Sequence, residues 1–518
     1  RMSGTGDIPV TGRGTGGVPV TGHDPTMGRS VSRTMVAAIL AVAVIAAGAT
    51  WWQVVRAPDL TTDPADAANI ARSRNTVRGI IRDRDGRVLA ASRRSEDGEP
   101  YRVYASDSTT GVVGYASRRY GTAGLERTFD AELAGRRDPD PIGDILDHLD
   151  PSRRLRGNDL RTSLSLPLQK LAVELLGDDR GAVVMLDPRT GEVLVDASTP
   201  TYDANTIADP AADPAYFAAL RVDPTSPLLP RPTQGLYVPG SVFKIVTAIA
   251  ALGSGAITPA TTYAEQPPAE RTGLDVDGYR VRDGHHPFTQ PKPLPLAEAT
   301  EVSCSIFYAL AGMAAGGQAL TDWAAGVGFG APLPYDLPTA VSQVTNGGGD
   351  YGGGFSDRVE LANAAYGQGE TLATPLQMAL VAAAVANDGL LMRPRVVTAI
   401  VSPDGATVTE RGPQEWRRVM DPSIARPIRD AMTLAVEGEY GRLFTTGAKV
   451  PGILTAGKSG TAETGGSGEP HSWFIGFAPA NDPQIAIAVL VEGGGSGATR
   501  ASPIAGLLMR AFFAEAGR

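Results

Sequence analysis

Apolar residues recur along the last two thirds of the chain with two different periods. Segments with a helical period alternate with apolar runs of strand length that end in turn signals. The predicted helices cover residues 166–176, 374–387 and 504–514. The predicted strands flank the turn Asp187-Pro188-Arg189-Thr190-Gly191 within residues 181–195, and further strands cover 456–463, 472–478 and 484–492. This mixture predicts one large α/β domain over residues 161–518.

Two other segments of this domain have less regular patterns. Residues 256–297 are rich in proline and are predicted to be a loop, and a helix is expected to resume from about residue 296 to 312. Residues 346–354 contain six glycines and predict a flexible connection.

The chain before residue 57 divides into a polar and an apolar part. Residues 1–33 are rich in Gly, Thr and Pro and predict a disordered cytoplasmic tail. Residues 34–55 contain no charge, and a bilayer crossing needs roughly 20 such residues. Arginines precede this segment and two tryptophans lie at its far end, which the positive-inside rule and the aromatic belt favour. We therefore expect one retained transmembrane anchor, with the rest of the chain outside the cytoplasm.

A cleaved signal peptide and a buried helix are the alternatives for residues 34–55. The apolar stretch is longer than the ~7–15 residues usual in a signal peptide. This length favours the anchor.

Residues 57–160 are charged and contain few strand patterns, which predicts a small pedestal domain. Asp85-Gly86 lies between two apolar runs within residues 78–90 and predicts a hairpin. Residues 121–133 are expected to be a loop that enters a short helix. This domain carries no apparent catalytic pair of acids, so we expect it to be structural.

Residues Tyr237–Thr247 contain the first candidate catalytic residues. Ser241 and Lys244 are three residues apart, a spacing that puts both side chains on one face of a helix. Pro239-Gly240 marks the start of this helix, so the hydroxyl is expected near the positive end of the helix dipole. The eight residues after Lys244 carry no charge, which predicts that a buried element presents the pair.

Composition narrows the functional classes. The net charge is −9 and no long basic run occurs, which argues against a nucleic-acid partner. Cys304 is the single cysteine, so an intramolecular disulfide is excluded. The five histidines lack zinc-ligand spacing, and no metal or cofactor is expected; they are His23, His148, His285, His286 and His471. Only five of the 47 basic residues are lysines, and lysine, unlike arginine, can lose its proton when buried.

Two more polar groups follow Ser241-x-x-Lys244. Ser303-Cys304-Ser305 interrupts a predicted helix, and Lys458-Ser459-Gly460-Thr461 lies on a predicted strand. Either group alone could occur by chance. Together, in this order, they resemble the three motifs of the penicillin-binding proteins and serine β-lactamases, Ser-x-x-Lys, Ser-x-Asn and Lys-Thr/Ser-Gly.

The resemblance extends to segments outside the motifs, over about residues 75–518. Residues 239–244, 367–370, 374–379, 471–479 and 78–90 look like segments of the membrane-anchored class B transpeptidases. The chain is similar in particular to the short actinobacterial penicillin-binding protein A type. The implied fold has an antiparallel sheet flanked by helices and an all-helical subdomain, preceded by a pedestal domain and one transmembrane helix.

The resemblance implies a peptidoglycan D,D-transpeptidase that β-lactams acylate. Ser241 would attack a D-Ala-D-Ala bond, and neutral Lys244, with a pKa lowered by burial and by Lys458, would take the proton. Ser303 would relay a proton to the leaving amine. Lys458, Ser459 and Thr461 would bind the terminal carboxylate, and the backbone N–H groups of Ser241 and Thr461 would form the oxyanion hole. The implied partners are stem peptides, β-lactams, the membrane and a glycosyltransferase.

One position departs from the family pattern. Ser305 stands where the family has asparagine. In the family this asparagine helps to orient the lysine of the first motif and the substrate amide, and a hydroxyl has a shorter reach and forms fewer hydrogen bonds, so catalysis is expected to be weakened or specialised.

Three other functions remain open. Residues 452–459 match the phosphate-loop pattern Gly-x-x-x-x-Gly-Lys-Ser, but glycines follow where that loop needs a helix. A non-catalytic β-lactam sensor or cell-wall scaffold of the same fold is the second, and Ser305 makes it more credible. The third is a D,D-carboxypeptidase.

Overall fold

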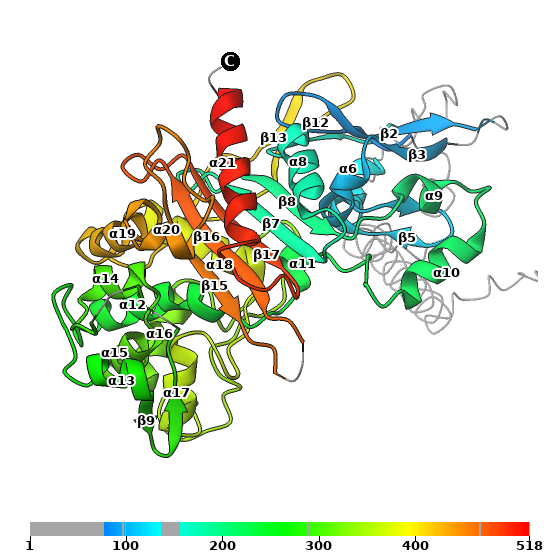
Figure 1. Cartoon of the computed structure of the whole chain (residues 1–518). Coiled ribbons are helices and arrows are strands. Elements are labelled where there is room, and N and C mark those ends of the chain that lie inside the picture. Colours follow the sequence, from blue (N-terminus) through cyan, green and yellow to red (C-terminus); the bar gives the residue numbers. More distant parts are fainter. Residues whose placement is uncertain are drawn as a thin grey trace, which may run out of the picture. The chain divides into compact units, whose positions relative to one another are not determined.

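A five-stranded antiparallel sheet is the central element of the computed structural model, which describes residues 77–95, 98, 100–135, 156–284, 286–287, 290–465 and 468–516. The strand order is β15-β16-β17-β7-β8 (Figure 1). The bounds are β7 Gly181–Leu186, β8 Val193–Thr199, β15 Ala456–Ala462, β16 His471–Ala478 and β17 Ile485–Val491. The strands predicted from apolar runs are therefore confirmed to within a few residues.

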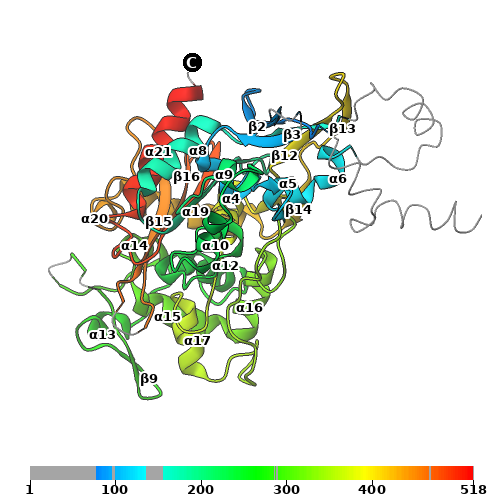
Figure 2. The ribbon, with the colours of Figure 1, turned by 90° about the vertical axis from the view of Figure 1, so that its right-hand side faces the viewer.

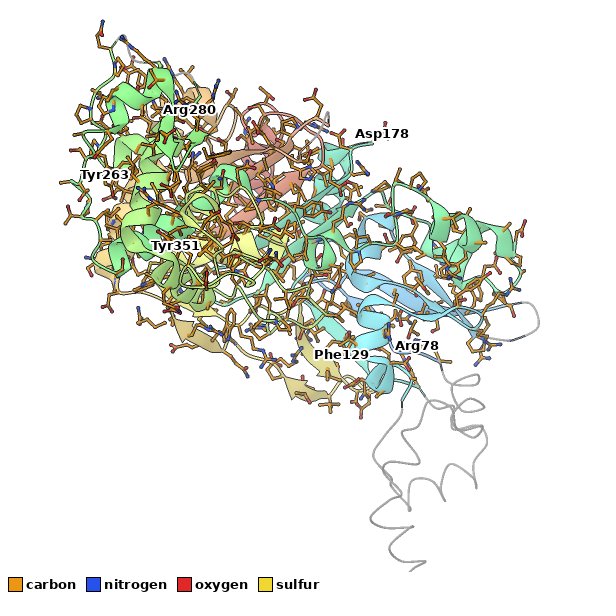
Figure 3. The ribbon with its side chains drawn as sticks, turned by 90° about the horizontal axis from the view of Figure 1, so that it is seen from below. Arg78, Phe129, Asp178, Tyr263, Arg280 and Tyr351 are labelled. Atoms are coloured by element: carbon orange, nitrogen blue, oxygen red, sulfur yellow. The ribbon has the colours of Figure 1, made fainter. Side chains whose placement is uncertain are left out.

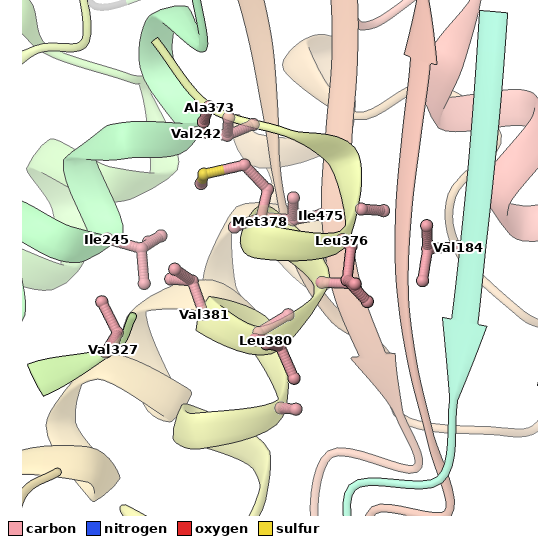
Figure 4. Close-up of a cluster of buried hydrophobic side chains, with 14 of the residues drawn as sticks. Val184, Val242, Ile245, Val327, Ala373, Leu376, Met378, Leu380, Val381 and Ile475 are labelled. Carbon is pink, nitrogen blue, oxygen red and sulfur yellow. The ribbon is translucent and has the colours of Figure 1, made fainter. Parts of the chain in front are cut away.

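Helices cover both faces of this sheet because its strands are apolar on both sides. The helices α8 (Leu166–Leu176) and α21 (Ala501–Ala516) pack on one face, against residues such as Val183 and Met185. The helix α18 (Pro375–Ala386) packs on the other face, where Val184 and Ile475 belong to a second buried cluster. Figure 4 shows the side chains of α18 between the sheet and the start of the helical region.

The helical region follows β8 in the chain and confirms the predicted helical subdomain in outline. Its helices are α12 Lys244–Gly253, α13 Gln266–Thr272, α14 Leu296–Glu301, α15 Ser305–Ala315, α16 Gly317–Gly326 and α17 Arg358–Ala365. The helices α19 Pro422–Glu437 and α20 Gly441–Phe444 connect it to β15.

The loop predicted for residues 256–297 is wrong. This segment contains α13 and a hairpin of two short strands, β9 (Leu274–Val276) and β10 (Tyr279–Val281). The high proline content caused this error. Pro267 lies in the first turn of α13, where backbone N–H groups have no partner inside the helix, so proline is tolerated there.

A second sheet contains the strands of the predicted pedestal. Its order is β13-β12-β6-β1-β2-β3, and the hairpin predicted at Asp85-Gly86 is confirmed by the pairing of β1 with β2. Two of its strands come from much later in the chain. The bounds are β1 Ile81–Arg82, β2 Val88–Arg94, β3 Pro100–Tyr104, β6 Asp159–Thr162, β12 Val397–Val401 and β13 Thr407–Glu410.

Several short elements complete the described part of the chain (Figure 2). The short helices are η2 Asp107–Thr109, α4 Thr110–Val113, α5 Gly124–Thr128, α6 Asp130–Leu133, α9 Ala204–Ala208, α10 Pro214–Val222 and α11 Arg231–Gln234. The short strands are β4 Ala116–Ser117, β5 Gly121–Thr122, β11 Leu390–Met392 and β14 Glu415–Arg418. The short helix expected within residues 121–133 is thus present as α5 and α6.

A buried carboxylate joins the N-terminal elements. Glu126 accepts hydrogen bonds from Arg78 at 2.9 Å and from Arg102 at 2.5 Å, and its side chain is completely buried. Arg411 follows β13, and its guanidinium carbon lies over the ring of Phe129, 5.6 Å from the ring centroid. Arg78 and Phe129 are labelled together in Figure 3. The contact between Phe129 and Arg411 links these N-terminal elements to the end of the β12–β13 hairpin.

The predicted tail (1–33) and anchor (34–55) lie outside the described residues. Within the described part of the chain, no helix combines the length and the apolar character that a bilayer crossing needs.

Candidate active site

Ser241 lies in a short 3-10 turn, η3 (Gly240–Phe243), that leads directly into α12. Gly240 has a φ of 56°, and its N–H donates to the carbonyl of Gly367 at 2.8 Å. A Cβ at Gly240 would lie 2.8 Å from the carbonyl oxygen of Thr461. Glycine is therefore required here, and the close approach brings the half-buried Ser241 beside β15.

Lys244 is the first residue of α12 and is completely buried. Its Nζ lies 2.6 Å from the carbonyl oxygen of Ser303, 3.3 Å from Ser303 Oγ and 3.0 Å from Ser305 Oγ. Ser303 lies between α14 and α15, and Ser305 is the first residue of α15. The structure thus brings the first and second sequence motifs into hydrogen-bond contact.

The second motif is a sharp break between two helices. Ser303 has a φ of 59°, a left-handed conformation that side chains disfavour. The N–H of Cys304 donates to the carbonyl of Ala299 at 2.8 Å, which closes the end of α14. This turn directs both oxygens of Ser303 toward Lys244.

The third motif lies on β15, the edge strand of the central sheet. Lys458 is 1% exposed, and its Nζ lies 2.9 Å from Ser303 Oγ and 2.8 Å from the carbonyl of Ser459. Among the described residues, the hydroxyls of Ser459 and Thr461 take no part in the hydrogen bonds that join the lysines to Ser303. Thr461 Oγ1 instead accepts from the N–H of Gly497 at 3.2 Å.

Burial dominates the protonation of the two lysines. It lowers the pKa of Lys244 to about 8, although the carboxylate of Asp283 acts in the opposite direction. Burial, together with repulsion from Lys244, lowers the pKa of Lys458 well below its usual value. The predicted fall in the pKa of Lys244 is therefore confirmed. Burial is its main cause, and the repulsion between the two buried amines opposes the protonation of the pair.

Residues 181–510, which hold all three motifs, match the family described as the penicillin binding protein transpeptidase domain. The chain belongs to this family. Residues 78–158 match the family described as the penicillin binding protein A dimerisation domain.

Relatives of this transpeptidase family cover nearly the whole chain. The peptidoglycan D,D-transpeptidase PbpA of Mycolicibacterium smegmatis is 35% identical over 92% of this chain and 97% of its own length. The ceftriaxone acyl-enzyme complex of penicillin-binding protein A from M. tuberculosis has a TM-score of 0.76 and 30% identity, and the match covers 85% of this chain and 99% of that one. The penicillin G acyl-enzyme complex of the same protein has a TM-score of 0.74 and 30% identity, over 86% and 100% of the two chains.

Asp283 was not predicted from the sequence, and it lies behind the second motif. Its carboxylate is 2% exposed and accepts from the N–H groups of Ser305 at 2.9 Å and Ile306 at 3.3 Å. Burial alone would raise the pKa of Asp283, but the hydrogen bond with His286 and the charge of Lys244 hold it at about 2. Asp283 lies in the segment mistaken for a loop, and no motif marks it.

Asp283 belongs to a group of three side chains whose donor atoms could hold a metal ion. The donor atoms of Asp283, His286 and Cys304 lie within 4.8 Å of one another. Carboxylate, imidazole and thiolate are ligands that Zn²⁺ accepts. The prediction that no metal is bound relied on the spacing of the histidines alone and did not consider this combination.

Proposed function

We propose that this penicillin-binding protein is a peptidoglycan D,D-transpeptidase, which cross-links stem peptides through an acyl-enzyme on Ser241 and is acylated by β-lactams. The observation that carries the proposal is the pair of buried amines, Lys244 and Lys458, on the single hydroxyl of Ser303. One of two adjacent buried amines loses its proton easily, and a neutral amine beside a serine is a general base.

In the first step, Ser241 Oγ attacks the carbonyl carbon of the penultimate D-Ala. The Oγ–C bond forms while the hydroxyl proton passes to Lys244 Nζ. The C–N bond then breaks as the terminal D-Ala amine receives a proton through Ser303. The N–H groups of Ser241 and Thr461 stabilise the oxyanion, and Ser305 binds the substrate amide.

The remaining groups bind the substrate and complete the cycle. Lys458 binds the terminal carboxylate, whose negative charge favours the protonated amine, and the hydroxyls of Ser459 and Thr461 approach this carboxylate along β15. The amine of a second stem peptide attacks the acyl-enzyme, gives its proton to the same base and releases Ser241. This second attack makes the reaction a cross-linking step instead of hydrolysis.

The location follows from the same proposal. Residues 34–55 anchor the chain in the membrane, residues 57–160 form the pedestal, and residues 161–518 act outside the cytoplasm. A glycosyltransferase that makes the glycan strands is the expected partner, because the proposed reaction forms the peptide cross-link and not the glycan strand.

The test is the intact mass after incubation with benzylpenicillin, followed by peptide mapping. The adduct is expected on Ser241, and Ser241→Ala should abolish it while the circular dichroism spectrum stays unchanged. A label on Ser303 or Ser459 would contradict the assignment. Incubation with a stem peptide and a labelled acceptor amine separates three outcomes: cross-linked product supports a transpeptidase, free D-Ala alone a carboxypeptidase, and a stable penicillin adduct without peptide turnover a sensor.

A further inference from the structure

The turn at Ser303 needs an anchor on each side because its backbone is strained. A left-handed conformation is unfavourable for a residue with a side chain, so the surroundings must hold Ser303 in place. On its N-terminal side, the N–H groups of Ser303 and Cys304 donate to the last turn of α14, at 3.2 and 2.8 Å. On the C-terminal side of the turn, an anchor has to hold the start of α15.

Asp283 supplies that second anchor. One carboxylate oxygen accepts from the N–H of Ser305 at 2.9 Å and the other faces the N–H of Ile306 at 3.3 Å. These are backbone donors of the first turn of α15, which have no partner inside the helix. A carboxylate also interacts favourably with the positive end of a helix dipole.

Asp283 is itself held in place from behind. His286 Nε2 lies 3.5 Å from its carboxylate, and His286 Nδ1 lies 3.2 Å from Glu270 on α13. Gln266, also on α13, hydrogen-bonds Glu270 with its amide and accepts from the N–H of Leu294 at 2.9 Å. The contacts of His286 therefore connect the carboxylate of Asp283 to α13.

We propose that Asp283 is a positioning residue that holds α15 so that Ser303 keeps its left-handed conformation and both of its oxygens stay on Lys244. Asp283 contacts no reacting atom and acts through Ser305 and Ser303. This inference rests on the proposed function, because the group that it positions is the proton path from Ser241. It also explains how a serine suffices at position 305, since the backbone of Ser305 is fixed independently of its side chain.

The experiment separates the acylation rate constant k2 from the dissociation constant Kd, by intact mass at several benzylpenicillin concentrations. In Asp283→Ala, k2 should fall about 10- to 100-fold, the equivalent of one or two lost charge-assisted hydrogen bonds, with Kd unchanged. Asp283→Asn keeps an oxygen for the N–H of Ser305, so it should restore part of k2.

Asp336 offers a matched control. Its buried carboxylate also accepts from two consecutive backbone N–H groups, those of Val396 at 2.7 Å and Val397 at 2.9 Å, at the start of β12. Asp336→Ala should lower the melting temperature and leave k2 unchanged. If Asp283→Ala cannot be purified in folded form, Asp283→Asn carries the comparison.

Three results would overturn the inference. The first is a wild-type k2 in folded Asp283→Ala. If that variant does not fold, a wild-type k2 in Asp283→Asn has the same meaning. An equal loss of k2 in Asp336→Ala would reduce the effect to general stability. A fall in the k2 of the wild-type protein after chelation would assign the effect to a bound metal. Failure of the proposed function is distinct, because the wild-type protein would then form no adduct.

Discussion

The two buried lysines determine when the site can react. The pKa of Lys244 is about 8, so the neutral amine that accepts the Ser241 proton is the minor form at pH 7. Lys458 is buried as deeply and shares Ser303 Oγ. The rate of acylation therefore depends on the protonation of these two buried amines.

The rate constant k2 should consequently rise about tenfold per pH unit below pH 8 and level off above it, because only the neutral amine can act as a base. Intact-mass kinetics between pH 6 and 9.5 measure this profile. Lys244→Arg should fail at every pH, as Lys244→Ala does, because a guanidinium has a pKa above ~12 and keeps its proton throughout this range. A flat profile, or partial rescue by arginine, would show that Lys244 acts only as a fixed cation.

Ser305 is within hydrogen-bond distance of Lys244, at 3.0 Å. Ser305→Ala should slow acylation up to about tenfold, since one neutral hydrogen bond contributes roughly 0.5–1.5 kcal/mol. Ser305→Asn should be tolerated and change k2 by no more than about one or two orders of magnitude, upward if the longer amide adds a bond. A loss in both variants would mean that the pocket is built around serine.

The motifs predicted which side chains lie close together, and the structure also shows the contacts that position them. Ser241, Lys244, Ser303 and Lys458 were predicted from three motifs and their resemblance to those of a known family, and each motif is local in the chain. Asp283 was not found because it acts from 20 residues before Ser303 through backbone N–H groups, which leave no side-chain pattern.

At the scale of single elements, apolar periodicity located α8, α18 and the five strands of the central sheet. These elements are buried on one or two complete faces, so their patterns are long. The hairpin β9–β10 consists of three-residue strands, which are too short to show a period. The same proline-rich segment holds Asp283, so one error hid both the hairpin and the anchor.

The strand β8 contains an unusual buried acid. Asp196 is 1% exposed, and Tyr335 donates to its Oδ2 at 2.9 Å, while Oδ1 has no hydrogen-bond partner among the described residues. Burial raises the pKa of Asp196 to about 6. The folded state therefore binds this proton more tightly than the unfolded chain does.

A raised carboxyl pKa favours the folded state below the unfolded value, near 3.8, and this advantage is lost as pH rises through about 6. Asp196→Asn should therefore raise the free energy of unfolding by about 1–3 kcal/mol at pH 8, with a gain that shrinks toward pH 4. Urea denaturation at several pH values measures the change. A destabilised variant at pH 8 would show that Asp196 has a charged partner that compensates its burial.

At the scale of the whole molecule, the second sheet ties distant parts of the chain together. The strand β6 pairs in parallel with β1 and antiparallel with β12, so its neighbours are about 80 and 240 residues away along the chain. The N-terminal strands therefore complete their sheet only when the segment after α18 has folded.

This shared sheet predicts one cooperative unfolding transition. Glu126→Gln leaves the guanidinium groups of Arg78 and Arg102 without their buried carboxylate, which should cost about 3–5 kcal/mol. The melting temperatures from circular dichroism and from loss of benzylpenicillin labelling should fall together. If labelling survives to a higher temperature than the first spectroscopic transition, the two sheets unfold independently.

The helix α18 has one more consequence. All twelve of its residues are buried, between the central sheet and the helical region. No small opening of a loop or terminus can expose its backbone to solvent, so its amide hydrogens should exchange with deuterium only when the entire molecule unfolds. The exchange rate of this single helix would then report the population of the globally unfolded state under native conditions.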